Sequence, residues 1–277
     1  SYIMCKKKYF FMKISINHSI CPSLSYENFF KLAKDLEIPN VEIRNDLLNL
    51  NFDLKAINEI SDLKEKYKIN VISINALQKF NIWNKERKDE LLYLCNAAKK
   101  INCKGIVLVP LNSGKYYEED QRLSLLKNSL NEIDFILSDY EIKGYVEPLG
   151  FKSSSLRYKS DVIDLLDTIE NKSKFSLVHD TFHHTVAEDK SIYVEHTSIV
   201  HISGVKNLVE ESYNFTDEMR ELIDESDRIK NVEQINFFLK NKFNGFFSIE
   251  PFSEKIQKSK NHLQLIKETL NFINQHR

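Results

Sequence analysis

The sequence predicts a single-domain α/β protein folded as a closed (β/α)₈ barrel, and three observations support this. Short apolar runs alternate with longer segments of helical spacing throughout the 277 residues, a pattern typical of parallel sheets. The alternation yields eight strands, and the length suits one barrel of about 250 residues. No linker rich in proline, glycine or serine divides the chain. The rival fold, an open doubly wound sheet, usually has a glycine-rich turn after its first strand, and residues 17–22 contain no glycine.

The first half of the chain contains four expected strand-helix units. Apolar runs predict strands at 13–17, 40–44, 70–75 and 105–110. The last of these is apolar throughout its centre, as expected for a strand buried on both faces. Apolar residues at helical spacing, such as Phe29, Phe30 and Ala33, predict helices between the strands. These helices cover 26–36, 54–67, 85–101 and 118–137.

The second half repeats the pattern with shorter helices. Strands are predicted at 144–147, 175–180, 198–202 and 245–250. Helices are predicted at 160–170, 186–193 and 259–275. The interval between the seventh and eighth strands is about 25 residues longer than a barrel unit needs. We expect this extra loop to be either a lid over the barrel mouth or tolerated surface. Residues 1–11 form an expected N-terminal extension, and residues 12–277 the barrel domain.

Composition narrows the class of protein. A net charge of −1 and a pI near 6.7 argue against a general polyanion-binding surface. No run approaches 18 apolar residues, so no transmembrane helix is expected. The segment 6–12 is basic and then apolar, but it meets a charge at Lys13 and does not resemble a signal peptide. The cysteines form no CxxC pair, which favours reduced thiols in the cytoplasm over a zinc site; they are Cys5, Cys21, Cys95 and Cys103.

Ligand-type side chains end four consecutive predicted strands. They are Glu147, Asp180, His201 and Glu250, separated by 33, 21 and 49 residues. In a barrel the carboxyl ends of strands meet at one mouth. Each residue alone has a structural interpretation as a helix cap, an ion-pair partner or an interior histidine. Together they would bury several like charges, which is costly without a cation. Three carboxylates with one imidazole predict a divalent metal site for Mn²⁺, Mg²⁺, Co²⁺ or Zn²⁺.

The segments around these residues resemble the xylose isomerase-like sugar isomerases and epimerases. The likeness lies in 146–147, 178–183, 200–202 and 248–250. Within that family it is nearest to the inosose isomerases, through 41–44, 75–77, 80–81 and 109–111. The resemblance implies a metal-dependent enzyme of carbohydrate or inositol metabolism. It also implies a small keto-sugar or inosose as the partner, with no nucleic acid or membrane; a homodimer is left open.

The resemblance also implies roles for individual residues. Glu147 and Glu250 would be the acid/base pair as well as metal ligands with Asp180 and His201. His183 would contact a substrate oxygen and help catalysis. The further substrate contacts that it implies, on early strands and a late loop, are Arg228, Asn75, Glu42 and Arg44. Asn17 would lie at the same mouth, and Trp83 would either stack on the sugar or pack in the core.

These residue types suit proton transfer on a keto-sugar. A divalent metal would stabilise an enediolate oxygen, one glutamate would remove the carbon-bound proton, and the same or the opposite glutamate would return it. Return at the neighbouring carbon gives isomerisation, and return at the same carbon from the other face gives epimerisation. Three alternatives remain: an inosose dehydratase-type lyase, a non-catalytic carbohydrate sensor and an endonuclease IV-like nuclease. The nuclease would need more metal-binding histidines and a basic phosphate track.

Overall fold

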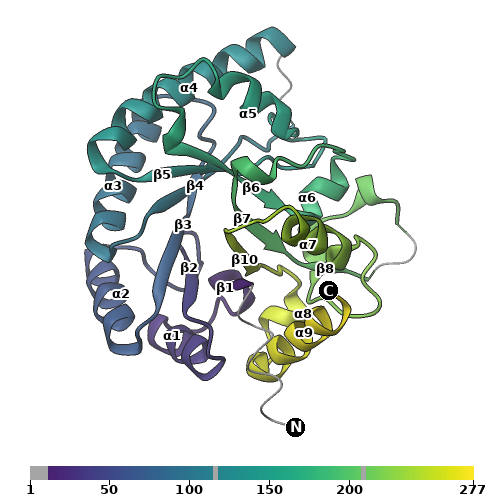
Figure 1. The fold of residues 1–277 in the computed structure, drawn as a ribbon. Coiled ribbons are helices and arrows are strands. Elements are labelled where there is room, and N and C mark those ends of the chain that lie inside the picture. Colours follow the sequence, from purple (N-terminus) through teal and green to yellow (C-terminus); the bar gives the residue numbers. More distant parts are fainter. Residues whose placement is uncertain (1–11, 115–117, 207–209) are drawn as a thin grey trace.

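The computed structural model describes residues 12–114, 118–206 and 210–277. Eight parallel strands close into a barrel inside a ring of helices (Figure 1). The first and last barrel strands pair with each other, with Ile14 opposite Phe247. Around the barrel the order is β1 (Lys13–Asn17), β10 (Phe246–Ile249), β7 (Thr197–Ile202), β6 (Phe175–Asp180), β5 (Lys143–Val146), β4 (Gly105–Val109), β3 (Asn70–Gln78) and β2 (Asn40–Arg44). The predicted (β/α)₈ barrel is therefore confirmed, and the open sheet is excluded.

The helices bury one apolar face against the outside of the strands. In α1, for example, Phe29, Phe30 and Ala33 are fully buried. The side chains of Ser25 and Asp53 cap the first two helices by accepting backbone N–H groups. The helices are α1 (Tyr26–Asp35), α2 (Leu54–Tyr67), α3 (Lys85–Ile101), α4 (Glu119–Tyr140), α5 (Lys159–Leu166), α6 (Thr181–Val186), α7 (Asn231–Lys240), α8 (Glu254–Gln257) and α9 (His262–His276).

One predicted helix is wrong. The stretch 187–193 contains no helix, and α6 begins earlier, at Thr181. The cause is a local cap, because the Asp180 carboxylate accepts the backbone N–H groups of Phe182 and His183. These bonds start a helix directly after β6. Asp180 thus ends a strand and caps a helix with one oxygen, while its other oxygen, Oδ2, takes no part in the cap.

The expected extra loop between β7 and β10 contains ordered elements. A two-stranded antiparallel ribbon pairs β8 (Gly204–Val205) with β9 (Arg220–Glu221). Helix α7 follows and buries Ile235 and Phe238. It supplies the barrel helix between β7 and β10, so this part of the interval is a regular unit. The ribbon is too short to give a periodic signal in the sequence, which is why it was not expected.

The barrel interior changes character along its axis. One interior cluster is apolar and comprises Ile72, Ala76, Val107, Tyr145, Val178 and Ile199. The Tyr145 ring fills the space beside Gly105, where an added Cβ would lie 1.9 Å from the ring. Two residues beyond Tyr145, Val178 and Ile199, the chain presents Glu147, Asp180 and His201. The apolar cluster is thus the floor beneath a polar mouth.

Three remaining predictions concern other parts of the chain. The proposed N-terminal extension and Cys5 lie outside the described residues. Cys21, Cys95 and Cys103 are buried free thiols, and burial raises the pKa of Cys95 and Cys103 to about 12. They therefore stay protonated at neutral pH, as poor metal ligands. Over the described ranges, no helix combines the length and apolar character that crossing a membrane requires.

Candidate metal centre

Four side chains predicted as ligands converge at the carboxyl-terminal mouth of the barrel. Asp180 and His201 lie near the ends of β6 and β7, and Glu147 and Glu250 directly follow β5 and β10. One potential ligand atom from each lies within 4.8 Å of the other three, and all four residues are buried. Three carboxylate oxygens and one imidazole nitrogen at this spacing suit Zn²⁺, Mn²⁺ or Co²⁺. The donor set therefore fits a divalent metal.

His201 presents one ring nitrogen to the converging carboxylates. Its Nδ1 lies 2.7 Å from Glu147 Oε1 and 3.0 Å from Glu250 Oε2. Asp180 Oδ2 is 3.9 Å from the same nitrogen. Burial alone would lower the pKa of His201, but Glu250, Glu42 and Glu147 together raise it well above its ordinary value. A cation at this point would replace the Nδ1 proton.

Glu42 lies beneath the metal-ligand group instead of lining the mouth. Its side chain is fully buried and receives hydrogen bonds from Ser73 Oγ at 2.6 Å and Asn75 Nδ2 at 3.0 Å. Asn17 Nδ2 adds a third at 3.3 Å. His201 Nε2 is 3.0 Å from Glu42 Oε1. Burial raises the pKa of Glu42. The charge of His201 and the hydrogen bonds from His201, Ser248 and Ser73 outweigh this and hold the pKa well below its usual range. Glu42, predicted as a substrate contact, is not among the residues that line the mouth cavity.

Arg220 is the site residue that the sequence did not reveal. Its Nη2 donates to Asp180 Oδ2 at 2.6 Å and to Glu250 Oε2 at 3.0 Å. The guanidinium lies between the rings of Phe182 and Phe252, at 5.0 and 4.6 Å from their centroids. It comes from β9, in the interval for which no structure was predicted. Its contacts with Asp180 and Glu250 could not be predicted from the local sequence pattern.

Arg228, predicted to bind substrate, lies elsewhere. Its Nη1 donates to the backbone carbonyl of Glu210 at 3.0 Å, and its guanidinium is 5.6 Å from the Phe215 ring centroid. It is not among the residues that line the mouth cavity. The arginine of this interval that lines the cavity is Arg220, eight positions earlier in the chain. Both arginines lie in a segment without clear periodicity, so local pattern offers no basis for choosing between them.

The two predicted acid/base glutamates have different surroundings. Glu250 receives hydrogen bonds from Arg44 Nη1 at 3.0 Å, Asn17 Nδ2 at 3.1 Å and Arg220 Nη2. Although burial raises it, the pKa of Glu250 is lowered overall by His201, Arg220 and Arg44. Burial raises the pKa of Glu147, and the charge of His201 offsets this only in part. Glu250 is thus held by three side-chain donors, two of them guanidinium groups, whereas burial has the largest effect on Glu147.

A cavity of about 300 Å³ lies over these residues. Of the predicted substrate contacts, Arg44, Asn75 and His183 line it, and Trp83 does not; Trp83 packs against the core instead. His183 Nδ1 accepts the backbone N–H of Gly150 at 3.2 Å, which leaves Nε2 to carry the proton. At Gly150 an added Cβ would lie 2.2 Å from the His183 carbonyl, so this contact requires glycine.

Comparisons with known proteins agree with this fold. A family model described as xylose isomerase-like TIM barrel matches residues 30–276. A xylose isomerase domain protein from Salmonella typhimurium LT2 is 29% identical, with a TM-score of 0.83 over 95% of this chain and 97% of that one. No curated protein matches the sequence significantly.

Two more distant solved structures share the fold. IolI protein with a bound zinc atom has a TM-score of 0.84 at 20% identity, over 96% of this chain and 99% of that one. D-psicose 3-epimerase from Clostridium cellulolyticum H10, solved with D-tagatose, has a TM-score of 0.67 at 15% identity, over 96% and 95%. At these identities the similarity establishes the architecture, and the chemistry has to be argued from the residues of the mouth.

Proposed function

The chain belongs to the xylose isomerase-like TIM barrel family, and we propose that it is a divalent-metal-dependent isomerase or epimerase of a keto-sugar or inosose. The observation that carries this proposal is the buried convergence of Glu147, Asp180, His201 and Glu250 beneath a cavity of sugar size. The zinc in IolI and the D-tagatose in the psicose epimerase structure support the same class of chemistry.

The charge of the site supports a resident cation. Four buried carboxylates, including Glu42, face two guanidinium groups and one imidazole. With a neutral imidazole the formal sum is −2, which one divalent ion would balance. When bound by Glu147, Asp180, His201 and Glu250, that ion would act as a Lewis acid toward the carbonyl and adjacent hydroxyl of a ketose.

Proton transfer falls to the two glutamates. Glu147, which lines the cavity, takes the proton from the hydroxyl-bearing carbon next to the carbonyl. The electron pair of the broken C–H bond becomes part of an enediolate. Return of the proton to the former carbonyl carbon, with the hydroxyl proton moving to the former carbonyl oxygen, completes an isomerisation. Delivery to the original carbon from the opposite face, by Glu250 in its protonated form, completes an epimerisation. It leaves Glu147 protonated and Glu250 ionised, and proton exchange with solvent resets both.

Other residues of the mouth bind and orient the substrate. His183 offers its Nε2 proton to a substrate oxygen, because Gly150 occupies its Nδ1. Such a donor stabilises an oxygen on which negative charge develops. Arg44 and Arg220 each form an ion pair with Glu250 at 3.0 Å and so hold this carboxylate in place. Phe151 and Phe252 supply apolar wall that excludes water from the reacting carbon.

The experiment is a proton-exchange screen by NMR in D₂O. The purified protein, loaded with Mn²⁺, Co²⁺ or Zn²⁺ in turn, is incubated with a panel of ketoses and with inosose. We expect deuterium to enter at the carbon next to the carbonyl of at least one substrate, and a chelator to stop this. An ultraviolet-absorbing enone product would instead identify a dehydratase-type lyase. Bound metal without exchange on any substrate would contradict the proposal.

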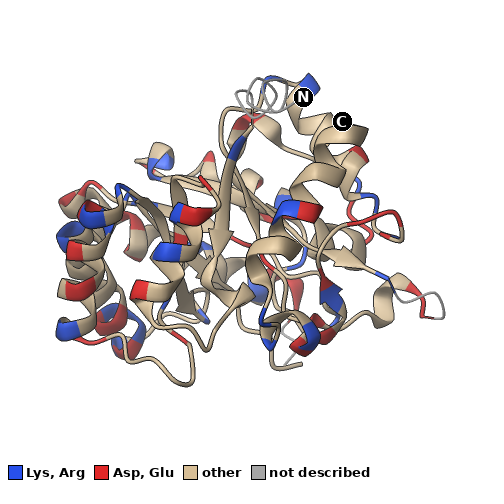
Figure 2. Ribbon diagram, turned by 90° about the horizontal axis from the view of Figure 1, so that it is seen from below, with Lys and Arg blue, Asp and Glu red and all other residues tan. Residues whose placement is uncertain are grey.

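The nuclease alternative finds no support in the described residues. The metal-ligand group found in these ranges contains one histidine and no second cluster. Figure 2 shows acidic and basic residues interspersed over the helices, with no continuous basic track in that view. A phosphate backbone would need such a track.

A further inference from the structure

The contact between Glu42 and His201 crosses the barrel interior. Glu42 is on β2 and His201 on β7, and the two strands are separated around the ring by β1 and β10. At the level of His201 the intervening strands carry Ser248 and, paired with it, Ser15. Both serines are fully buried. Small side chains at these two positions leave the room that the Glu42 carboxylate uses to reach the imidazole.

The Glu42 carboxylate is held in one orientation. Ser73 Oγ and Asn75 Nδ2 both donate to Oε2, at 2.6 and 3.0 Å, and Asn17 Nδ2 donates to Oε1 at 3.3 Å. These donors come from β3 and β1, the two neighbours of β2. A carboxylate fixed from both sides in this way is a rigid acceptor for His201 Nε2, which faces its Oε1.

The two nitrogens of His201 therefore have separate partners. Nε2 faces Glu42, and Nδ1 faces Glu147, Glu250 and Asp180. A histidine that binds a metal through one nitrogen usually donates the other N–H to a carboxylate or carbonyl, which fixes the tautomer and the ring plane. If Nε2 carries the proton that faces Glu42, Nδ1 is the nitrogen that is available to a metal ion.

We propose that Glu42 is a positioning residue that holds the proton of His201 on Nε2 and so makes Nδ1 the metal-binding atom. The inference rests on the metal centre of the proposed function and adds a residue that touches neither ion nor substrate. It assigns the tautomer of His201. It also predicts that a substitution of Glu42 changes metal affinity more than substrate affinity. A glutamine at this position would keep the shape of the side chain but would weaken the acceptor.

The first test measures metal affinity by competition with a chromophoric chelator. We expect Glu42→Gln to weaken Zn²⁺ binding about 10- to 100-fold, as removal of comparable partners does. Ser73→Ala, which frees one side of the carboxylate, should cause a smaller loss. Glu141→Gln, the same substitution at an exposed position on the other end of the barrel, is the matched control and should bind like wild type. Wild-type affinity in Glu42→Gln would overturn the inference.

The second test needs no variant at Glu42 and so does not depend on its folding. Histidine-selective ¹⁵N NMR of the zinc-loaded wild type, with the His201 signals assigned by their loss in His201→Gln, reports the state of each ring nitrogen. We expect a protonated Nε2 and a metal-bound Nδ1. Zinc on Nε2 would contradict the inference. Both readouts are independent of turnover, so a protein that binds zinc in this way without exchanging any keto-sugar would overturn the proposed function alone.

Discussion

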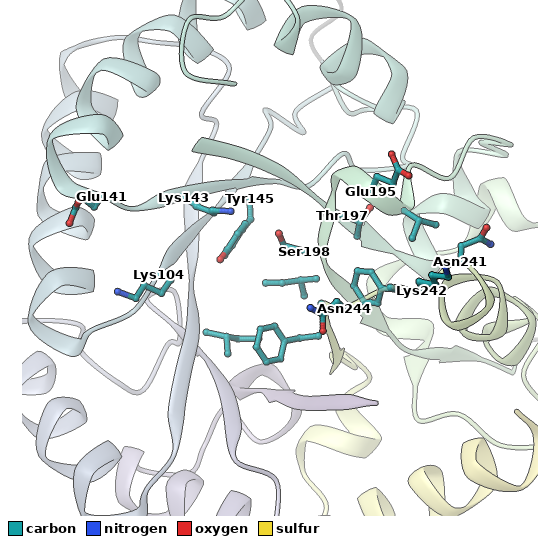
Figure 3. A pocket seen from close by; sticks show the side chains of 16 residues that line it. Lys104, Glu141, Lys143, Tyr145, Glu195, Thr197, Ser198, Asn241, Lys242 and Asn244 are labelled. Atoms are coloured by element: carbon teal, nitrogen blue, oxygen red, sulfur yellow. The ribbon is translucent and has the colours of Figure 1, made fainter. Parts of the chain in front are cut away.

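The two ends of the barrel each have a cavity, and the larger cavity is not the one that lies over the candidate metal ligands. The amino-terminal end has the larger cavity, about 680 Å³, bordered by strand beginnings and by the exposed residues Lys104, Lys143 and Lys242. Figure 3 shows the side chains that line this amino-terminal cavity, among them Tyr145, Ser198 and Asn244. The carboxyl-terminal cavity is less than half as large, about 300 Å³. Yet the metal-ligand group of the described residues lies beneath this smaller one.

Burial of charge accounts for the difference. The carboxylates at the mouth are almost completely enclosed, so their charges act on one another through little solvent. The charged groups of the amino-terminal cavity, such as Glu141 and Glu195, are exposed and screened by water. At the mouth, burial raises the pKa of Glu147, whereas His201, Arg220 and Arg44 lower the pKa of Glu250. Reactivity in this barrel follows from convergence of buried groups, as in other barrels of this kind.

The largest expected effect is the loss of either acid/base glutamate. Glu147→Gln and Glu250→Gln should each lower the proton-exchange rate by about 10²- to 10⁴-fold, because each removes a proton-transfer group and a ligand. Glu141→Gln, at the opposite end, should keep the wild-type rate. NMR exchange in D₂O measures all three. Full activity in both mouth variants would mean that the proton moves through other groups.

The next effect concerns stability. Arg220→Ala leaves Asp180 and Glu250 buried without their shared guanidinium, a change that typically costs about 3–5 kcal/mol. We expect the metal-free variant to unfold at a much lower urea concentration than wild type. Saturating Zn²⁺ should restore part of the difference, since the ion also compensates these carboxylates. An unchanged unfolding free energy would show that solvent already screens the pair.

A third prediction uses pH. The pKa of His201 is raised in the folded state, so its proton stabilises the metal-free protein fully below the unfolded value of about 6.5. That contribution is lost as pH rises through the folded pKa. Metal affinity should change in the opposite sense and increase with pH, because the ion competes with the Nδ1 proton.

Urea unfolding and chelator competition across pH 6–9 measure the two trends. His201→Gln removes the titrating ring and serves as the control. In that variant both slopes should flatten. A metal affinity that stays constant with pH in wild type would contradict the assignment of Nδ1 as a protonated site in the metal-free state.

The smallest expected effect is at the amino-terminal cavity. Lys143→Ala should change the exchange rate less than about twofold, in keeping with surface substitutions away from the site. The matched comparison is Arg44→Ala at the mouth, which removes a partner of Glu250 at 3.0 Å and should slow exchange strongly. A large loss in Lys143→Ala would show that the two ends are coupled.

The sequence predicted what depends on local pattern. The strand 13–17 and the helix 54–67 have the bounds that were expected, because alternation and apolar spacing are properties of neighbouring residues. Strand ends also placed Glu147, Asp180, His201 and Glu250 at one mouth, because parallel strands share a direction. The error at α6 arose from a capping carboxylate, which no periodicity reports.

What the sequence could not supply depends on contacts across the barrel. Arg220 reaches Glu250 from a short ribbon 30 residues away in the chain, and Glu42 meets His201 across 159 residues. Neither contact has a local signature. The choice between Nδ1 and Nε2 likewise follows from which strand each nitrogen faces. These are properties of the closed ring, and they appear only once eight strands are placed around it.

The most direct test of the central claim is a metal titration that reads proton exchange at the same time. Protein stripped by a chelator receives increasing Zn²⁺ or Mn²⁺ with a keto-sugar or inosose identified by the screen, and exchange is followed by NMR. We expect exchange to rise linearly and to stop rising at one ion per chain, with Asp180→Asn showing neither tight binding nor exchange. Exchange by fully stripped protein, or tight binding of the ion by Asp180→Asn, would contradict a metal centre built from these four side chains.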